Sequence, residues 1–278
     1  MYQKENVMDV LTADQRHRYW EIGWLVVEGV FGRSRVDGIA ELARAIGSAE
    51  MEQAPVGLAA GYPENYRLDR SASGETAPRK IGSPFTKHQQ FRDFALDPKL
   101  REMVNELIGK PVDLMGDQIF LKPPRFGSRK PYHQDNAYFR CFPADDVITA
   151  WIALNDVDEQ NGCVRYIDGS HRGPLLPHEP VAGEPFNQAP RSELIDLSKE
   201  SPARVGRGGV VFHHSQTLHT SHENRSDRWR CGYATHWVHR DVRCETDVLD
   251  AAYFHRADYP SYNRLSRTNS PNLSRTGQ

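Results

Sequence analysis

The sequence predicts a mostly β protein, in which one sandwich or barrel is flanked by α-helices on its N-terminal side. From about residue 111 onwards, short runs rich in Val, Ile, Tyr and Trp alternate with turn residues, a pattern typical of such folds. Before residue 108, apolar residues recur instead at helical spacing. The chain has 278 residues, and β folds of about 200–250 residues are often one domain. We therefore expect a single domain over residues 1–278.

The helical layer is expected over about residues 11–108. A capping box that begins at Thr12 marks the start of a first helix, and Gly23 marks its end. Residues 24–30 are rich in Val and Leu and favour a strand. Residues 34–46 have apolar side chains on one face and favour an amphipathic helix.

The next segments combine a long irregular stretch with further helices. Residues 53–86 are rich in Gly, Pro and Ser without a period, so we expect a long loop of the kind that can cover an active site. Residues 91–108 favour a helical pair that is broken at Asp97-Pro98. At the other end of the chain, residues 256–278 are expected to form a flexible tail.

The β core is expected over about residues 111–240. Turn signals such as Asn161-Gly162 and Asp168-Gly169 separate its short apolar runs. The expected strands cover residues 113–122, 132–138, 147–154, 164–167, 210–214, 217–222 and 229–239.

Charge and hydropathy argue against a nucleic-acid or membrane partner. The formal net charge is -2 and the sequence pI is about 6.6, so no strong positive field is available. The longest apolar runs are far shorter than the ~20 residues that a membrane span needs. Residues 1–9 are polar and charged, unlike a signal peptide. We expect a cytoplasmic protein that acts on a small molecule, and the sequence leaves its oligomeric state open.

The four cysteines show no paired spacing. Cys141, Cys163, Cys231 and Cys244 are scattered along the chain, without a C-x-x-C motif. In a chain of this size we expect free thiols in a reducing compartment, rather than a disulfide frame or a zinc site.

The candidate metal ligands are two histidines and one aspartate. On a strand, residues two apart point to the same side, so His133 and Asp135 face one way and Gln134 faces the other. With His219 they make the ligand set of a non-haem Fe(II) site that leaves coordination positions open. Open positions indicate oxygen chemistry. A second triplet, His239-Arg240-Asp241, has no supporting context and is interpreted as an exposed strand end.

An arginine is expected beside this metal site. His219 and Ser221 share one face of their strand. If that strand pairs with the next one about a turn at residues 223–227, Arg230 lies opposite Ser221 and Gly232 lies opposite His219. An inward Arg needs an anionic partner, which is either a protein acid or an organic acid that also binds iron.

Several motifs taken together resemble the phytanoyl-CoA dioxygenase (PhyH) family, from about residue 11 to residue 238. The motifs are Phe120-Leu121-Lys122-Pro123-Pro124, Pro131-Tyr132-His133-Gln134-Asp135, Asn161-Gly162-Cys163, Asp168-Gly169-Ser170-His171, and Leu218-His219-Thr220-Ser221 followed by Arg230. The resemblance implies a double-stranded β-helix, which is a cupin-like jelly roll. It also implies Fe(II), 2-oxoglutarate as a cosubstrate, and O₂.

The resemblance also implies a role for individual residues. His133, Asp135 and His219 would bind the iron, and Arg230 would hold the distal carboxylate of 2-oxoglutarate with help from Ser221. Four further residues would contribute to the cosubstrate or substrate pocket: Gln134, Trp151, Gln118 and, more loosely, Lys80.

The sequence therefore predicts an Fe(II)- and 2-oxoglutarate-dependent dioxygenase. It would hydroxylate, or otherwise oxidise, a small organic substrate and form succinate and CO₂. Two alternatives remain open at this point: a cupin-type metal enzyme that does not use 2-oxoglutarate, and a non-catalytic jelly-roll binding protein. The substrate itself, and whether it is a CoA thioester, is not predicted.

Overall fold

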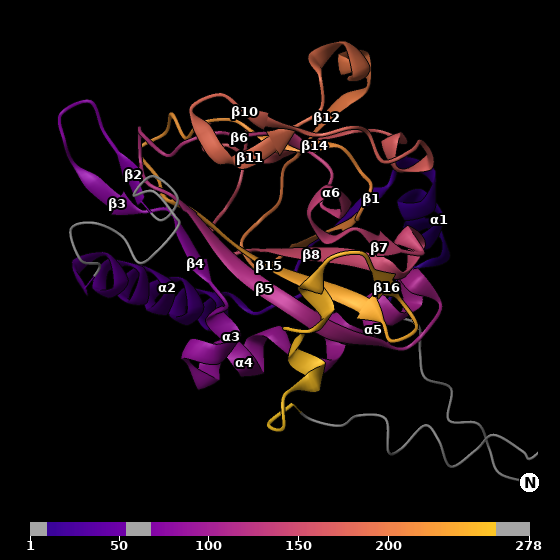
Figure 1. Cartoon of the computed structure of the whole chain (residues 1–278). Helices are drawn as coiled ribbons and strands as arrows, with labels where there is room; N and C mark the ends of the chain where they lie inside the picture. The colour runs from indigo at the N-terminus through magenta and orange to yellow at the C-terminus, as the bar shows by residue number, and fades with distance from the viewer. Residues whose placement is uncertain (1–9, 54–67, 260–278) are drawn as a thin grey trace, which may run out of the picture.

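A computed structural model describes residues 10–53 and 68–259 of the chain (Figure 1). Two antiparallel sheets lie one above the other, and the helices from the first half of the chain cover the outer face of the larger sheet. The expected mostly β, jelly-roll class with flanking N-terminal helices is confirmed.

The larger sheet has six strands in the order β1-β13-β8-β15-β5-β4. Their bounds are β1 Trp24–Val27, β13 Val210–His214, β8 Val147–Ala153, β15 Arg230–His239, β5 Val112–Lys122 and β4 Lys80–Gly82. β15 is central and pairs along its length with β5 on one side and β8 on the other. Every residue of β8 and β13 is buried, which explains their nearly continuous apolar sequences.

The smaller sheet has four strands in the order β12-β9-β14-β6. Their bounds are β12 Glu200–Ala203, β9 Val164–Ile167, β14 His219–Ser221 and β6 Lys130–His133. A hairpin of β10 (Glu179–Val181) and β11 (Glu184–Ala189) packs against β6. The remaining strand pairs are β2 (Leu68–Arg70) with β3 (Thr76–Pro78), and β7 (Cys141–Phe142) with β16 (Arg243–Cys244).

The α-helices are mostly early in the chain. They are α1 Ala13–Ile22, α2 Arg33–Gln53, α3 Pro84–Lys87, α4 Gln89–Ala95, α5 Pro98–Ile108 and α6 Asn136–Phe139. Short 3₁₀ turns cover Ala144–Asp146, Ser170–Arg172, Ser192–Leu194, Leu197–Lys199, Asp247–Leu249 and Tyr253–His255.

The first and fifth helices begin and end where the sequence predicts. Thr12 caps α1 through a complete capping box, and Gly23 ends it with a φ of 88°. The Asp97 side chain accepts a hydrogen bond from the Lys99 amide at the start of α5. Gly109 then ends α5 in the left-handed conformation.

α2 is longer than expected and continues to Gln53. Gly47 does not end it, because the helix packs closely on β3 at this point. A Cβ atom on Gly47 would lie 2.8 Å from Cβ of Pro78. The glycine is therefore a site of close packing inside the helix rather than a terminator.

Two expected segments differ in the structure. The described part of the predicted 53–86 loop contains β2, β3, β4 and α3, so Lys80 lies on a strand. The predicted strand 132–138 ends early at His133, and α6 follows with Asp135 as its N-cap residue in helical conformation. Of the predicted tail, residues 256–259 are described, and there Tyr259 is buried and its hydroxyl accepts a hydrogen bond from the Leu114 amide.

The predicted pairing of the His219 strand with the Arg230 strand is wrong. β14 pairs with β6 and β9 in the smaller sheet, while β15 belongs to the larger sheet. Arg230 lies opposite Lys122, and Gly232 lies opposite Phe120 on one side. The turn between the two strands is thus a crossing from one sheet to the other, not a hairpin.

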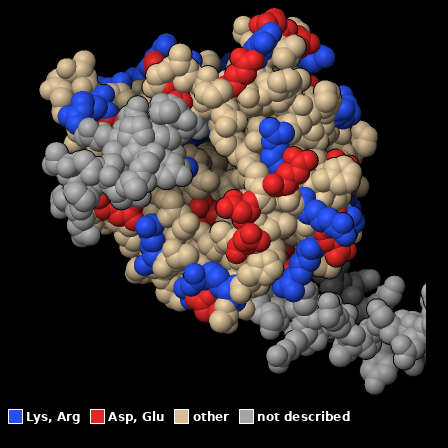
Figure 2. Space-filling view, viewed as in Figure 1, with Lys and Arg blue, Asp and Glu red and all other residues tan. Residues whose placement is uncertain are grey.

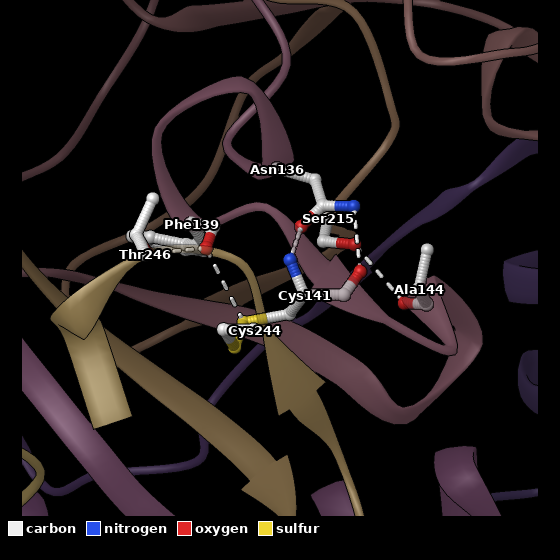
Figure 3. Close-up of a disulfide and its surroundings, with 7 residues drawn as sticks. All are labelled: Asn136, Phe139, Cys141, Ala144, Ser215, Cys244 and Thr246. Atoms are coloured by element: carbon white, nitrogen blue, oxygen red, sulfur yellow. Dashed lines mark hydrogen bonds between the residues drawn. A yellow bond between two sulfur atoms is a disulfide. The ribbon is translucent and has the colours of Figure 1, made fainter. Parts of the chain in front are cut away.

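The prediction of four free thiols is also wrong. Cys141 and Cys244 form a disulfide between β7 and β16, although they are 103 positions apart (Figure 3). The Asn136 side chain bonds to both the backbone N–H and the backbone carbonyl of Cys141. Only Cys163 and Cys231 are free, and both are buried. A pairing of residues this distant follows from the tertiary fold and leaves no mark in the spacing of cysteines.

The apolar core has two main layers. Between the helices and the larger sheet, buried side chains such as Phe94, Val104 and Ile148 pack together. A second layer between the two sheets includes Trp151 and Tyr166. The space beside this second layer holds the candidate site.

Candidate metal centre

Two imidazoles and one carboxylate meet at one point between the sheets. His133 ends β6 and lies directly opposite His219 of β14, and their ring centroids are 4.1 Å apart. Oδ1 of Asp135 lies 3.7 Å from Nε2 of each histidine. These three residues are the only group of this kind in residues 10–53 and 68–259, and their ligand atoms all lie within 4.8 Å of one another. Such separations fit three ligands of one ion, because metal–ligand bonds are about 2.0–2.2 Å.

Backbone contacts orient the two imidazoles. Nδ1 of His133 lies 2.9 Å from the Pro131 carbonyl, and Nδ1 of His219 lies 2.9 Å from the Thr217 carbonyl. Each Nδ1–H therefore donates to a carbonyl, and each Nε2 lone pair is left for a metal. Burial and the neighbouring His213 lower the pKa of His219 to about 4, and burial with the neighbouring His219 holds the pKa of His133 well below its usual value. Both rings are therefore neutral, as metal binding requires.

A network of hydrogen bonds holds the carboxylate. Thr149 donates to Oδ2 of Asp135 at 2.6 Å, and Nε2 of His213 lies 3.0 Å from the same oxygen. Burial raises the pKa of Asp135, but the hydrogen bond from His213 and the nearby imidazoles outweigh it, and the pKa lies well below its usual value. The carboxylate is therefore ionised, with Oδ2 engaged and Oδ1 directed at His133 and His219.

The sequence motifs do not indicate this supporting network. His213 holds Asp135 through Nε2, while its Nδ1 lies 2.9 Å from the Tyr166 hydroxyl. Because its Nε2 is bonded to Asp135, His213 is not a fourth ligand. His236 bonds to Thr149 through Nδ1, and its Nε2 has no partner within the described residues. The alternation along β13 and β15 could have placed both histidines on the inner face.

A cavity of about 940 Å³ surrounds the three ligands. It lies between the two sheets, and the molecule is hollowed at this level on the face shown in Figure 2. Acidic and basic side chains are mixed over this face. The residues predicted for the site that line the cavity are His133, Asp135, His219, Arg230, Ser221, Trp151, Gln118 and Lys80.

Gln134 is the predicted site residue that the structure does not bring to the cavity. Its side-chain amide donates to the carbonyls of Pro174 and Gln216, and its oxygen accepts from the Leu176 amide at 2.8 Å. It therefore connects the loops at Pro174, Leu176 and Gln216 and does not line the cavity.

Arg230 is buried on the wall formed by the larger sheet. Its guanidinium lies 4.5 Å from the ring centroid of Trp151. The ring lies over Gly232, where a Cβ atom would come within 1.8 Å of it. The Trp151 ring therefore occupies the place that a side chain at position 232 would take. The expected strand pairing had put Gly232 opposite His219 instead.

Within residues 10–53 and 68–259 the guanidinium has no acidic partner. Arg230 is 2 % exposed and forms no salt bridge with any residue that the structure describes, and its Nε has no hydrogen-bond partner there. Burial lowers the pKa of Arg230 to about 10, so it remains charged at neutral pH. A buried, unpaired cation that faces a cavity favours binding of an anion.

Comparison with known proteins identifies the family. The Phytanoyl-CoA dioxygenase (PhyH) family profile matches residues 19–232. The chain belongs to this family. The peroxisomal phytanoyl-CoA dioxygenase of Bos taurus is 28% identical over 250 residues, which cover 87% of this chain and 72% of that protein. The probable alpha-ketoglutarate-dependent hypophosphite dioxygenase of Stutzerimonas stutzeri is 28% identical over 220 residues, covering 77% and 74%.

A solved structure of similar fold is EvdO2 from Micromonospora carbonacea var. aurantiaca complexed with 2-oxoglutarate. The TM-score is 0.64 at 19% identity, with 82% of this chain and 90% of that chain covered. Family membership confirms the enzyme class predicted from the sequence: an Fe(II)- and 2-oxoglutarate-dependent oxygenase.

Proposed function

We propose that the cavity is the active site of an oxygenase that hydroxylates, or otherwise oxidises, a small organic molecule and forms succinate and CO₂. In this proposal His133, Asp135 and His219 bind Fe(II), and Arg230 with Ser221 binds the distal carboxylate of 2-oxoglutarate. The observation that carries it is the presence, in one cavity, of the three-residue cluster and of a buried guanidinium that has no acidic partner among the described residues.

The chain's own residues supply position and charge. When bound by two imidazoles and one carboxylate, Fe(II) keeps positions open for a 2-oxo acid and O₂ and supplies the oxidising chemistry. Arg230 has a planar fork that can hold a carboxylate through two hydrogen bonds. Trp151 fixes the guanidinium from one side. Lys80, whose ammonium lies 5.5 Å from the ring centroid of Phe120, is a second cation on this wall.

The unpaired arginine also separates this function from the alternatives. A cupin-type enzyme that uses no 2-oxo acid has no need for a charge at Arg230, and a binding protein has no need for the three ligands around one point. Gln118 lines the same wall two residues before Phe120, and we propose that it contacts the cosubstrate. We propose no such contact for Gln134, since its amide is bonded elsewhere.

The test is anaerobic addition of Fe(II) and 2-oxoglutarate to the purified protein. We expect a weak metal-to-ligand charge-transfer band in the visible range, which fades when air is admitted. Asp135→Ala should give no band and no succinate while it keeps the fold, because the residue lies in a cavity wall. No band with the parent protein, or a band that persists in air, would contradict the proposed function.

The partners and the cellular compartment of the protein are proposed only in general terms. The described residues include no helix with the length and apolar character to cross a bilayer. We propose no nucleic-acid partner, because acidic and basic side chains are mixed over the face shown in Figure 2. The cytoplasmic location expected from the sequence stays a prediction. The Cys141–Cys244 disulfide counts against the cytoplasm, because such bonds are commoner in oxidising compartments.

A further inference from the structure

The cavity is lined by a further basic residue that the proposed function does not use. Lys130, on β6 of the smaller sheet, is one of the residues that line the cavity. Nζ lies 2.6 Å from Oδ1 of Asn187 and 3.2 Å from the hydroxyl of Tyr138. A lysine ammonium has three N–H donors. Two are used by these neutral groups, and within the described chain the third has no acceptor.

The other charges near Lys130 do not neutralise it. Outside the metal cluster, the acid that acts on it is Glu184. The Glu184 carboxylate is already bonded to Arg129 at 3.1 Å and to the Asn187 amide at 2.7 Å. Arg79, another cation at the cavity, is paired with Asp69. Burial and the nearby Arg79 lower the pKa of Lys130 to about 8, so it is mainly protonated at neutral pH.

The position of Lys130 differs from that of Arg230. Arg230 lies against Trp151 in the larger sheet, whereas Lys130 projects from the smaller sheet toward the β10–β11 hairpin, which lies beside β6 in Figure 1. The Tyr138 ring contacts His133 edge-on, with 5.9 Å between the ring centroids, and its centroid lies 5.0 Å from the ammonium of Lys130. The Tyr138 ring therefore lies between His133 and a group bound at Lys130.

We propose that Lys130, whose ammonium group is positioned by Oδ1 of Asn187, is the recognition site for an oxyanion of the primary substrate, either a carboxylate or a phosphonate. This inference rests on the proposed function, in which 2-oxoglutarate satisfies Arg230 and the metal. A second anion is then needed to satisfy Lys130. The substrate class is accordingly a small organic acid, whose oxidised carbon lies between its anionic group and the metal.

The test compares charged and neutral probes of one shape. The full-length protein is loaded with Zn(II) in place of iron and with saturating 2-oxoglutarate. Binding of benzoate, phenylphosphonate and neutral benzamide is then measured by ligand-observed NMR. We expect both anions to bind about tenfold or more tightly than benzamide, because a charge-assisted contact in a shielded site is worth about that much. Equal binding of benzamide, or no binding of either anion, overturns the inference.

Variants test whether Lys130 is the residue responsible. Lys130→Met should lose the preference for anions, and Lys130→Arg should keep it. The matched control is Lys199→Met, since Lys199 is exposed outside the cavity and paired with Asp196. The melting temperature of Lys130→Met should equal or exceed that of the parent, because a partly buried charge has been removed. Unchanged benzoate binding by Lys130→Met contradicts the assignment.

Calorimetric titration with 2-oxoglutarate distinguishes the two proposals. We expect the affinity of Lys130→Met for 2-oxoglutarate to match that of the parent. If it falls tenfold, Lys130 belongs to the cosubstrate site and this inference fails while the proposed function stands. If the parent itself does not bind 2-oxoglutarate, the proposed function fails and this inference fails with it.

Discussion

Arg230 is the residue at which binding and stability are expected to oppose each other. Its charge is buried without an acidic partner in the described structure, which disfavours folding and favours an incoming carboxylate. We expect Arg230→Met to raise the 2-oxoglutarate concentration for half-maximal succinate formation by about 10–100-fold. The melting temperature should stay the same or rise.

The control for this variant lies two residues earlier. Arg228→Met removes an exposed arginine that is paired with Asp158 on the surface, and it should leave the 2-oxoglutarate requirement unchanged. Succinate formation measured against 2-oxoglutarate concentration compares the three proteins. A requirement for Arg230→Met equal to that of the parent would remove Arg230 from the cosubstrate site.

At this scale the sequence indicates the three candidate ligands more clearly than the residues that support them. His133, Asp135 and His219 stand out because their residue types and spacing belong to one chemistry. His213 and Lys130 carry no such signal, since the groups that make them important come from other strands: the carboxylate that His213 bonds is 78 positions away. For Gln134, strand alternation and family resemblance led to opposite predictions. Strand alternation placed it on the outer face, as the structure does, while family resemblance implied a pocket role.

Among the elements, β5 contains a buried titratable group that predicts a pH dependence. Asp117 accepts hydrogen bonds from the hydroxyls of Tyr233 and Tyr253 and from the Phe85 amide, and so joins β5 to β15, the C-terminal segment and α3. Burial raises the pKa of Asp117 to about 6, against the lowering effect of these hydrogen bonds. A raised folded-state pKa means that the protonated form favours folding.

The resulting stabilisation is fully present below about pH 4 and is lost as the pH rises through about 6. The parent should lose about 3 kcal/mol of unfolding free energy across this window relative to Asp117→Asn, which does not titrate. Urea unfolding of both proteins at intervals from about pH 4 to pH 7 measures the difference. Parallel stability curves would show that Asp117 has an ordinary pKa.

The strands themselves were predictable where local sequence decides them. β8, β9 and β13 match expectation because continuous β-branched and apolar runs have few other solutions. The pairing of β14 was not predictable in this way. A short turn between two strands suggests a hairpin, and only the packing of two sheets shows that the chain crosses between them.

At the scale of the whole molecule, the disulfide connects the segment after the candidate metal ligands His133 and Asp135 to the C-terminal part of the chain. Cys141 follows α6, which Asp135 begins, and Cys244 follows the last long strand. Reduction by dithiothreitol should lower the unfolding free energy by about 2–5 kcal/mol, as expected for a bond that closes a long loop. Thermal unfolding with and without reductant measures the effect.

The double variant Cys141→Ser/Cys244→Ser is the control, because its melting temperature should not respond to reductant. Cys163 and Cys231 remain in it as buried free thiols. If the parent melts at the same temperature with and without reductant, the disulfide does not stabilise the fold. The class of fold could be foreseen from alternating strands and turns, whereas this bond depends on the completed tertiary structure.

The position of β15 between β5 and β8 limits where the chain can be truncated. The family match stops at residue 232, near the start of β15, yet this strand joins β5 to β8 in the middle of the larger sheet. A chain cut at the family boundary would leave β5 and β8 with two bare hydrogen-bonding edges facing each other across a gap. Such edges recruit strands from other molecules, so the truncated protein would be expected to aggregate.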